Sequence, residues 1–286
     1  MILLTGVTGT VGREVMKIVA SKDIVVRALV RDKTNIEVVK NSGIEVIAGD
    51  LEKQESVEKA LHGIERAFLL MANNEKQAVI EKQFIDLARK ANVSHIVKMS
   101  ANNAASDSSV ILKRYHGEAE EYLEQSGITY TFIRPDFFMQ NLLHVAGTIL
   151  GEDKFYLPMG PGVTGMVDVR NIADVIVHTL VEDGHDGRTY QISGPEVLSF
   201  NDVARLFSEV LGREIAYIDI PAQDLETRLL AEGQNPWYVH AILELFGAVA
   251  QTRDIALTDT FKELTGKKPN SLQTFIKDHI NLFNGN

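Results

Sequence analysis

The chain has 286 residues, of which 45% are hydrophobic and 24% are charged. This composition is typical of globular proteins and not of disordered, collagen-like or membrane chains. Because the sequence has no cysteine, it excludes disulfides, thiolate nucleophiles, iron–sulfur clusters and Cys-based zinc sites. The formal net charge of −10 disfavours nucleic acid and anionic lipid as direct partners.

The first residues, MILLTGVTG, are apolar and contain no basic leader. No run in the sequence approaches the roughly 18 uncharged apolar residues that a membrane helix needs. We therefore expect a cytoplasmic protein that does not contact a membrane.

Short apolar runs alternate with stretches of helical periodicity through the first half of the chain. The runs are rich in β-branched residues and are too short for buried helices. Because they show little polar alternation, they are typical of parallel strands that are covered by helices on both faces. The sequence predicts an α/β fold, a Rossmann-like doubly wound parallel sheet, with strands at 2–4, 25–30, 44–47, 67–70, 95–99 and 130–133.

The pattern changes after Pro135. A helical stretch at 137–150 precedes a segment rich in glycine and proline at 157–165, and helices are expected to end near Gly212 and to begin at Pro236. We expect a small-molecule ligand to bind in a cleft between two lobes. The dinucleotide-binding lobe is predicted to contain 1–136, with 166–195 returning to it, and the smaller, mainly helical lobe to contain 137–165 and 196–286.

Three glycines follow the first predicted strand at a spacing of three residues, directly before a predicted helix. Gly6 permits a tight turn, Gly9 lets backbone amides approach a pyrophosphate, and Gly12 lets the helix pack closely on the sheet. The helix N-terminus then faces the anion. The alternative is an ordinary glycine turn, but the strand-turn-helix context favours a dinucleotide. The expected cofactor contacts in this turn are Gly6, Thr8, Gly9, Thr10, Val11 and Gly12.

The second strand ends at Arg31 and Asp32, where an acidic residue would hold a ribose 2′-hydroxyl. A guanidinium binds a 2′-phosphate with paired donors, whereas a carboxylate repels it. We expect Arg31, with Lys33 nearby, to make NADP(H) the preferred cofactor, with NAD(H) as a possible one. The alternative is that Arg31 is a solvated charge at a strand end. Asp50, followed by Leu51, is a candidate acceptor for the adenine amino group, or a helix N-cap.

Several segments resemble the NmrA-like family of atypical short-chain dehydrogenases/reductases. They are LTGVTGTVG, ALVRD, HIVKMSA, GEAEEYLEQSGITYTFIRPDFFMQNLL and MVDVRNIADV, and the resemblance covers about residues 1–200 and extends to the whole chain. The resemblance implies an NADPH-dependent reductase of quinones, triphenylmethane dyes or azo compounds, or a regulator that senses NADP(H). Sugar-nucleotide epimerases are more distant relatives.

Catalytic members of the larger superfamily carry a Tyr and a Lys four residues apart on the helix before the sixth strand. In this sequence those two positions are Leu112 and His116, and Lys113 and Tyr115 are only two residues apart. A spacing of two points side chains roughly 200° apart around a helix. The chain therefore lacks the usual acid and base for alcohol oxidation. Hydride transfer to a conjugated ring chiefly needs the ring stacked on the nicotinamide, and solvent can protonate the product.

Two residues are candidates for catalysis. The resemblance gives Ser100 the position of a substrate-orienting hydroxyl, which also contacts the cofactor, and the alternative is a helix cap. His116 is a candidate proton donor because its unperturbed pKa is near neutral, and the alternative is a partly exposed helix histidine. Glu118, Glu120 and Glu121 are expected on a solvated helix face. The other histidines show no ligand spacing, so no metal site is expected.

Further contacts are expected at other strand ends. Met71, Ala72 and Asn73 follow the fourth strand at the carboxyl edge of the sheet, where the cofactor crevice runs. The resemblance sets Pro135 and Phe137 against the nicotinamide. Apolar residues at helical spacing are also typical of a core. Substrate contacts are expected from Phe137, Phe138, Asn141 and Trp237, of which Trp237 is otherwise an interlobe or subunit contact.

The leading hypothesis is an NADPH-dependent oxidoreductase that transfers hydride to a quinone or another small planar acceptor. The alternative is an NADP(H)-binding redox sensor that acts on a regulatory protein partner, and a homodimer is a further possible assembly. Epimerisation of a nucleoside-diphosphate sugar fits the fold but lacks its usual acid and base.

Overall fold

The computed structural model of the chain describes residues 1–22, 24–31 and 44–285. Contacts between Cα atoms divide the chain into two compact units. The first unit contains Met1–Ser109, Lys113–Arg134 and Ile172–Gln191, and the second contains Val110–Leu112, Pro135–Asn171 and Ile192–Asn286.

A seven-stranded sheet of order β3-β2-β1-β4-β5-β6-β9 organises the first unit. Neighbouring strands from β3 to β6 pair in parallel. The polarity of β9 is the same, because Gly187 N–H donates to Tyr130 O and, further along both strands, Asp136 N–H donates to Ile192 O. The strands are β1 (Ile2–Leu4), β2 (Val26–Val30), β3 (Glu45–Ala48), β4 (Arg66–Leu69), β5 (His95–Met99), β6 (Thr129–Pro135) and β9 (Arg188–Ile192).

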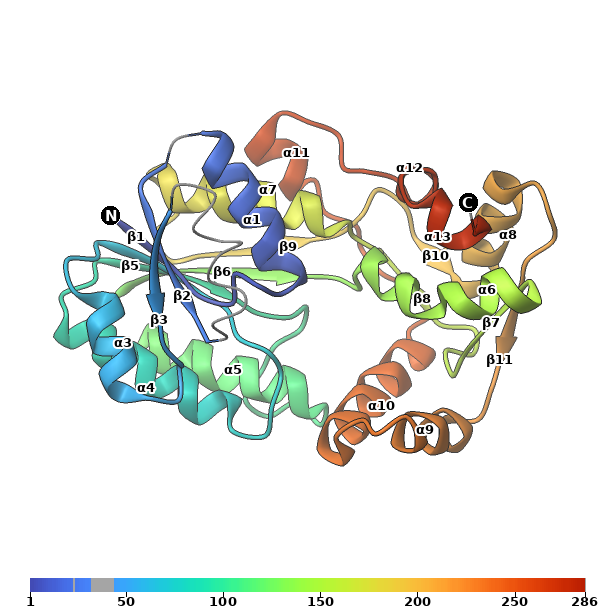
Figure 1. Cartoon of the computed structure of the whole chain (residues 1–286), viewed down its shortest axis with the longest axis horizontal. Helices are drawn as coiled ribbons and strands as arrows, with labels where there is room; N and C mark the ends of the chain where they lie inside the picture. Colours follow the sequence, from blue (N-terminus) through green and yellow to red (C-terminus); the bar gives the residue numbers. More distant parts are fainter. Residues whose placement is uncertain (23, 32–43, 286) are drawn as a thin grey trace. The chain divides into compact units, whose positions relative to one another are not determined.

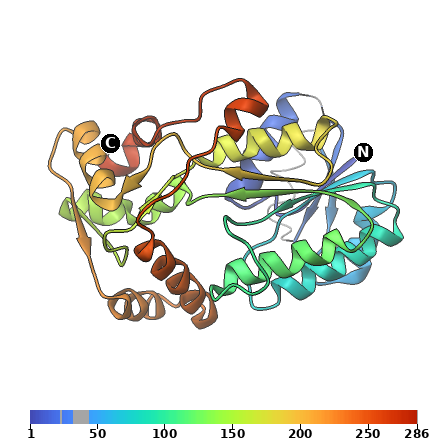
Figure 2. The same ribbon diagram turned by 180° about the vertical axis from the view of Figure 1, so that it is seen from behind.

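Helices cover both faces of this sheet, which confirms the predicted doubly wound α/β fold (Figures 1 and 2). The helices α1 (Thr10–Ser21) and α7 (Val169–Val181) lie on one face. The opposite face carries α3 (Gln54–Leu61), α4 (Gln77–Lys90) and α5 (Ile111–Glu124). All residues of β2 and β5 are buried, as expected for strands covered on both sides.

The second unit is mainly helical and has two small sheets. β7 (Lys154–Leu157) pairs in parallel with β11 (Ala216–Asp219), and β8 (Val163–Thr164) pairs antiparallel with β10 (Leu198–Ser199). The core of this unit is aromatic, with Phe155, Phe200, Phe207, Phe275 and Phe283 fully buried. Its helices are η2 (Met139–Val145, a 3-10 helix), α6 (Ala146–Glu152), α8 (Phe200–Leu211), α9 (Ala222–Ala231), α10 (Pro236–Gln251), α11 (Thr260–Thr265), α12 (Leu272–Asp278) and α13 (Ile280–Asn284).

Two helix boundaries predicted from the sequence are confirmed. Gly212 ends α8 with a positive φ of 69°, and Pro236 is the first residue of α10, which Asn235 caps through its side chain. The start of α8 also carries a capping box between Ser199 and Asp202. These local signals set where the two helices begin or end.

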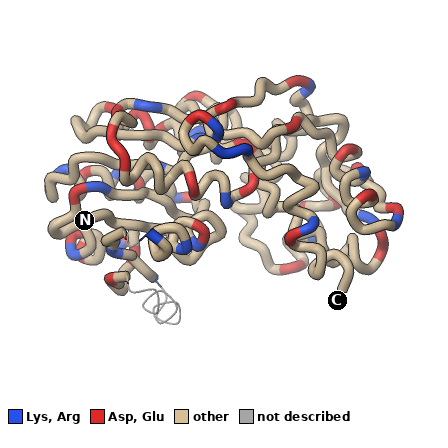
Figure 3. Tube along the Cα trace, turned by 90° about the horizontal axis from the view of Figure 1, so that it is seen from above, with Lys and Arg blue, Asp and Glu red and all other residues tan. Residues whose placement is uncertain are grey.

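Charges of both signs are interspersed along the trace of each unit (Figure 3). Among the residues that the structure describes, no helix is both long and apolar enough to cross a membrane.

Candidate functional site

The turn after β1 is held at the carboxyl edge of the sheet by Thr5. Its hydroxyl lies 2.8 Å from both the carbonyl oxygen and the amide nitrogen of Leu70, and 3.1 Å from Phe68 O. The next residue, Gly6, has a φ of +65°, which L side chains rarely adopt. A Cβ atom at Gly6 would also lie 2.7 Å from Leu70 O. The buried threonine therefore ties the chain to β4 at the point where it leaves the sheet.

Gly12 and Gly9, the other two glycines of the turn, differ in whether the surrounding atoms leave room for a side chain. A Cβ atom at Gly12 would lie 2.1 Å from Gly6 O and 2.6 Å from Val7 Cα, so the packing of α1 against the turn requires glycine. At Gly9 the nearest atom to such a Cβ is Gly6 O at 3.4 Å, and Gly9 is exposed. The protein's own packing therefore leaves the space above Gly9 open.

This open space faces the start of α1. Gly9 is the N-cap residue of α1, and it makes no side-chain capping hydrogen bond. The first amides of a helix have no intrahelical acceptor, and together they favour an anion. The Gly9 amide already donates to Gly6 O at 3.1 Å, so Thr10 and Val11 present the main-chain donors at a place where a side chain is missing. This arrangement fits the diphosphate of a dinucleotide. The turn would hold the cofactor mainly through its backbone.

The residues expected near the adenosine lie at the ends of the next two strands. Arg31 directly follows β2 and is exposed, while Lys33 lies outside the described residues. Asp50 follows β3, and its Oδ1 accepts a hydrogen bond from Glu52 N at 3.1 Å. The N-cap of α3 is Lys53, so Asp50 stabilises the turn before the helix and does not cap the helix itself. The half-buried Leu51 lies in the same turn.

The segment after β4 lies beside the glycine turn, because Leu70 contacts both Thr5 and Gly6. Met71 is half-buried, and Ala72 and Asn73 are exposed. These three residues therefore follow the strand adjacent to β1 at the same edge of the sheet.

Ser100 lies at the carboxyl end of β5. Its amide donates to Ile133 O at 2.8 Å, which continues the pairing of β5 with β6 by one residue. The side chain is 4% exposed, and its Oγ has no hydrogen-bond partner among the described residues. A buried hydroxyl without a partner is costly, and such groups are typical of sites that a ligand completes.

Lys98, two residues before Ser100, belongs to a cluster of charged and polar side chains. Lys98 of β5 is fully buried, and its Nζ lies 3.1 Å from Glu81 Oε2, 3.0 Å from Met99 O and 3.0 Å from His116 Nδ1. Glu81 belongs to α4, and His116 belongs to α5. Gln77, also on α4 and fully buried, has its Nε2 3.4 Å from Nδ1 and 3.5 Å from Nε2 of His116.

The environment of this cluster shifts its pKa values. Burial holds the pKa of His116 well below its usual value, and the positive charges of Lys98 and Arg134 lower it further. Burial also raises the pKa of Glu81, against the opposing effect of Lys98. A histidine with a strongly lowered pKa is neutral at physiological pH, so the near-neutral pKa expected from the sequence is wrong for His116.

A glycine next to His116 fixes the position of α5. A Cβ atom at Gly117 would lie 2.2 Å from Ala105 C and 2.4 Å from Ser106 N, so the helix touches the loop after β5 through its backbone. This close approach brings His116 to the carboxyl end of β5. The expectation of a solvated face is wrong for Glu120, which is buried and binds the guanidinium of Arg134 through both of its carboxylate oxygens.

Sequence reasoning missed Lys98, Glu81 and Gln77 as members of this cluster. One signal was available, because Lys98 is the single charged residue within the apolar run IVKM. Its partner Glu81 on α4 lies 17 residues before it in the sequence, and His116 on α5 lies 18 residues after it. Nothing local in the sequence pairs them.

The remaining predicted residues belong to the second unit. Pro135 is buried, and Phe137 is 8% exposed and packs edge-on against Phe200 with ring centroids 6.0 Å apart. Its contacts are those of a core residue. Phe138, Asn141 and Trp237 are half-buried at the start of η2 and in the first turn of α10.

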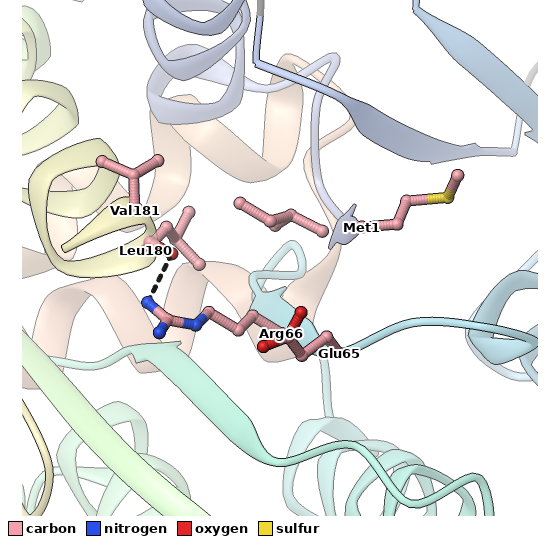
Figure 4. Close-up of a pocket in the computed structure, with 6 residues that line it drawn as sticks. Met1, Glu65, Arg66, Leu180 and Val181 are labelled. Atoms are coloured by element: carbon pink, nitrogen blue, oxygen red, sulfur yellow. Dashed lines mark hydrogen bonds between the residues drawn. The ribbon is translucent and has the colours of Figure 1, made fainter. Parts of the chain in front are cut away.

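A cavity of about 290 Å³ lies at the opposite edge of the sheet, at the amino ends of β1 and β4 (Figure 4). Met1, Ile2, Glu65, Arg66, Leu180 and Val181 line it. The Arg66 guanidinium already donates to Leu180 O at 3.1 Å and to Glu182 O at 3.0 Å. The cavity is therefore separate from the glycine turn and offers no free anion-binding group in Arg66.

Comparisons with known proteins give the family and the fold of the chain. Residues 1–276 match the model of the NmrA-like family. The chain is 32% identical to an NAD(P)H azoreductase of Xenophilus azovorans over 283 residues, 99% of each chain, and 28% identical to quinone oxidoreductase 2 of Escherichia coli over 82% of each. A crystal structure of the E. coli NADPH-dependent quinone oxidoreductase QOR2 with NADPH superimposes with a TM-score of 0.87 at 23% identity, covering 98% of this chain and 99% of that one. The chain belongs to the NmrA-like family.

Proposed function

We infer that this protein is an NADPH-dependent reductase of a small planar acceptor, a quinone or a related conjugated compound. The observation that carries the inference is the turn after β1, where Gly9 leaves open space in front of uncapped main-chain amides. When bound, NADPH supplies a hydride, and a quinone that takes up this hydride and one proton becomes a hydroquinone.

Residues at the carboxyl edge of the sheet would hold the cofactor. The turn from Gly6 to Gly12, including Thr8, would bind the diphosphate, and Arg31 would bind the 2′-phosphate through paired donors. Arg31 supports a preference for NADPH because it is exposed at the end of β2. Asp50 and Leu51, with the segment 71–73, would line the path between the adenosine and the nicotinamide.

The choice of acceptor rests on what the chain lacks and on what its relatives do. Leu112 and His116 occupy the positions of the usual Tyr and Lys, so an alcohol would find no acid and base of that kind. A flat conjugated ring needs neither. The azoreductase and the quinone oxidoreductase to which the chain is similar act on acceptors of this class by name. Ser100, whose buried hydroxyl lacks a partner among the described residues, would orient the acceptor.

The test is a titration of the purified protein with NADPH and with NADH, followed by NADPH oxidation with a panel of quinones and azo dyes. The proposal predicts saturable NADPH binding, tighter than that of NADH, and turnover with at least one planar acceptor. Tight NADPH binding without turnover on any acceptor would contradict the reductase and favour a redox sensor. Absence of binding to both nucleotides would contradict the proposal as a whole.

A further inference from the structure

The hydrogen bond between Lys98 and His116 can have only one direction. The Lys98 Nζ, 3.0 Å from His116 Nδ1, is an ammonium in an ion pair with Glu81, and an ammonium only donates hydrogen bonds. Nδ1 must therefore accept, which leaves the single proton of the neutral ring on Nε2. Lys98 Nζ also donates to Met99 O at 3.0 Å and forms an ion pair with Glu81 Oε2 at 3.1 Å.

The charged groups around the ring all act against its protonation or are already neutralised. Lys98 on β5 and Arg134 on β6 are both positive, and they lower the pKa of His116 together with burial. The two nearby carboxylates are engaged elsewhere, Glu81 with Lys98 and Glu120 with Arg134. His116 therefore stays neutral, and it keeps an N–H donor through the physiological pH range.

This donor lies on the same side of the sheet as Ser100. Side chains two residues apart on a strand point to the same face, so Ser100 shares the face on which Lys98 meets α4 and α5. Three buried polar atoms of this cluster and its surroundings, Ser100 Oγ, Gln77 Oε1 and Glu81 Oε2, have no hydrogen-bond partner among the described residues, although Glu81 Oε2 is ion-paired with Lys98. All three side chains are more than nine-tenths buried. Together these atoms indicate that a polar ligand binds here and supplies their hydrogen-bond partners.

We propose that His116 donates a hydrogen bond from Nε2 to the acceptor oxygen, and that Lys98 and Glu81 are positioning residues that lock this tautomer. The proposal rests on the function proposed above, and it assigns the acceptor a carbonyl oxygen, as in a quinone. The hydride adds to the ring and negative charge grows on the oxygen, which the neutral imidazole stabilises while it keeps its own proton. The proton that neutralises the product comes from water.

The tautomer is measured in the wild-type protein, without substitution or turnover. The chain has eight histidines, and long-range ¹H–¹⁵N spectra of histidine-labelled protein report the protonation state of each ring. The signal that disappears in His116→Leu identifies His116. We expect the neutral Nε2–H pattern to persist well below the usual histidine pKa of about 6.5. An imidazolium pattern at neutral pH, or a proton on Nδ1, would overturn the proposal.

The kinetic test compares two substitutions at His116. Glutamine places an amide donor near the position of Nε2, whereas leucine keeps the volume and removes the donor. With a quinone as acceptor, we expect His116→Leu to lower kcat about 100-fold and His116→Gln to retain most of it, with KM for NADPH unchanged in both. A merely structural role predicts similar losses in the two variants. Equal kcat values in both would overturn this proposal and leave the proposed function intact, because wild-type NADPH binding and turnover test that function separately.

The role of the ion pair is tested with the double variant Lys98→Met/Glu81→Leu, which removes both buried charges together. We expect the His116 pKa to rise but to stay below its usual value in this variant, because burial and Arg134 still lower it, and we expect the proton of the neutral ring to be shared between Nδ1 and Nε2. A ring that stays neutral with its proton on Nε2 would show that the pair does not set the tautomer. The wild-type spectrum decides the proposal even if this variant folds poorly.

Discussion

The glycine turn after β1 and the charged cluster beneath Ser100 lie at the carboxyl edge of one sheet, but they are built by different means. The turn offers main-chain amides next to the exposed residues Gly9 and Thr10, and its three glycines lie within seven residues of the chain. The cluster uses polar side chains from α4, β5 and α5; those of α4 and β5 are almost completely buried, and His116 of α5 is half-buried. On the proposed function, the first region would bind charge with backbone dipoles near water, whereas the second holds charge in a low-dielectric interior.

The difference predicts where each region is vulnerable. A backbone site tolerates changes to neighbouring side chains but fails when a side chain fills its open space. A buried ion pair is sensitive to the loss of either partner, because the remaining charge has no water to solvate it. Substitutions in the two regions should therefore separate cofactor binding from stability.

The largest effect is expected from Lys98→Met. This substitution leaves the Glu81 carboxylate buried without its cation, so we expect the free energy of unfolding to fall by about 3–5 kcal/mol. Urea unfolding measures it. Because the double variant Lys98→Met/Glu81→Leu has no orphaned charge, it should be more stable than the single variant. A single variant as stable as the wild type would show that the pair contributes nothing to the fold.

Gly12 and Gly9 of the turn provide a pair of substitutions that separate stability from cofactor binding. Gly12→Ala forces a Cβ atom against main-chain atoms of Gly6 and Val7, and we expect it to cost about 1–3 kcal/mol of stability. Gly9→Val would bring its Cβ atom only into ordinary contact with Gly6 O at 3.4 Å, but valine is a poorer N-cap residue than glycine, so we expect it to cost about 1 kcal/mol. NADPH affinity should nevertheless fall about 100-fold, since two or more charge-assisted hydrogen bonds are lost. Unfolding curves and nucleotide titrations of both variants check this, and unchanged NADPH affinity in Gly9→Val would contradict the backbone site.

A smaller effect is expected from Arg31→Ala. We expect NADPH affinity to fall about 10-fold while NADH affinity is unchanged, because only NADPH carries the 2′-phosphate. Arg188→Ala is the matched control, since Arg188 is also exposed but begins β9 at the other edge of the sheet. Equal losses for NADPH and NADH, or a similar loss in the control, would remove the role of Arg31.

The smallest effect concerns the pH dependence of stability. Burial lowers the pKa of His95, His116 and His185, so these rings bind protons more strongly in the unfolded chain than in the folded one. Their contribution is absent above the unfolded pKa of about 6.5 and becomes destabilising as the pH falls below it. We expect His116→Gln to flatten the fall in the free energy of unfolding by about 1 kcal/mol between pH 7 and pH 5. An unchanged slope would mean that His116 has the same pKa in the folded protein as in the unfolded chain.

The sequence was sufficient to predict the features that depend only on residues close together in the chain. The strands from β1 to β6 follow from short apolar runs, and the glycine turn follows from three residues in strand-turn-helix context. The stretch 137–150 was expected to be helical throughout, and it begins instead as the 3-10 helix η2 before α6. There, Met139 N–H donates to Val167 O, a contact with a distant segment.

The features that local patterns cannot show are the pairings between elements. Glu120 looks like a solvated helix residue in the sequence, and only its meeting with Arg134 of β6 explains why it is buried. Lys98 is readable as an anomaly within an apolar strand, but its partners are set by how α4 and α5 pack on β5. The near-neutral pKa expected for His116 failed for the same reason, since neighbours remote in sequence determine it.

The most direct test of the account follows the backbone amides of Gly9, Thr10, Val11 and Gly12 by ¹H–¹⁵N spectroscopy while the full chain is titrated with NADPH. The account predicts that these amide signals shift in a saturable way, and that they do so before any acceptor is added. Saturable shifts confined to the cavity around Arg66 and Leu180, or no shifts at a large excess of NADPH, would contradict it.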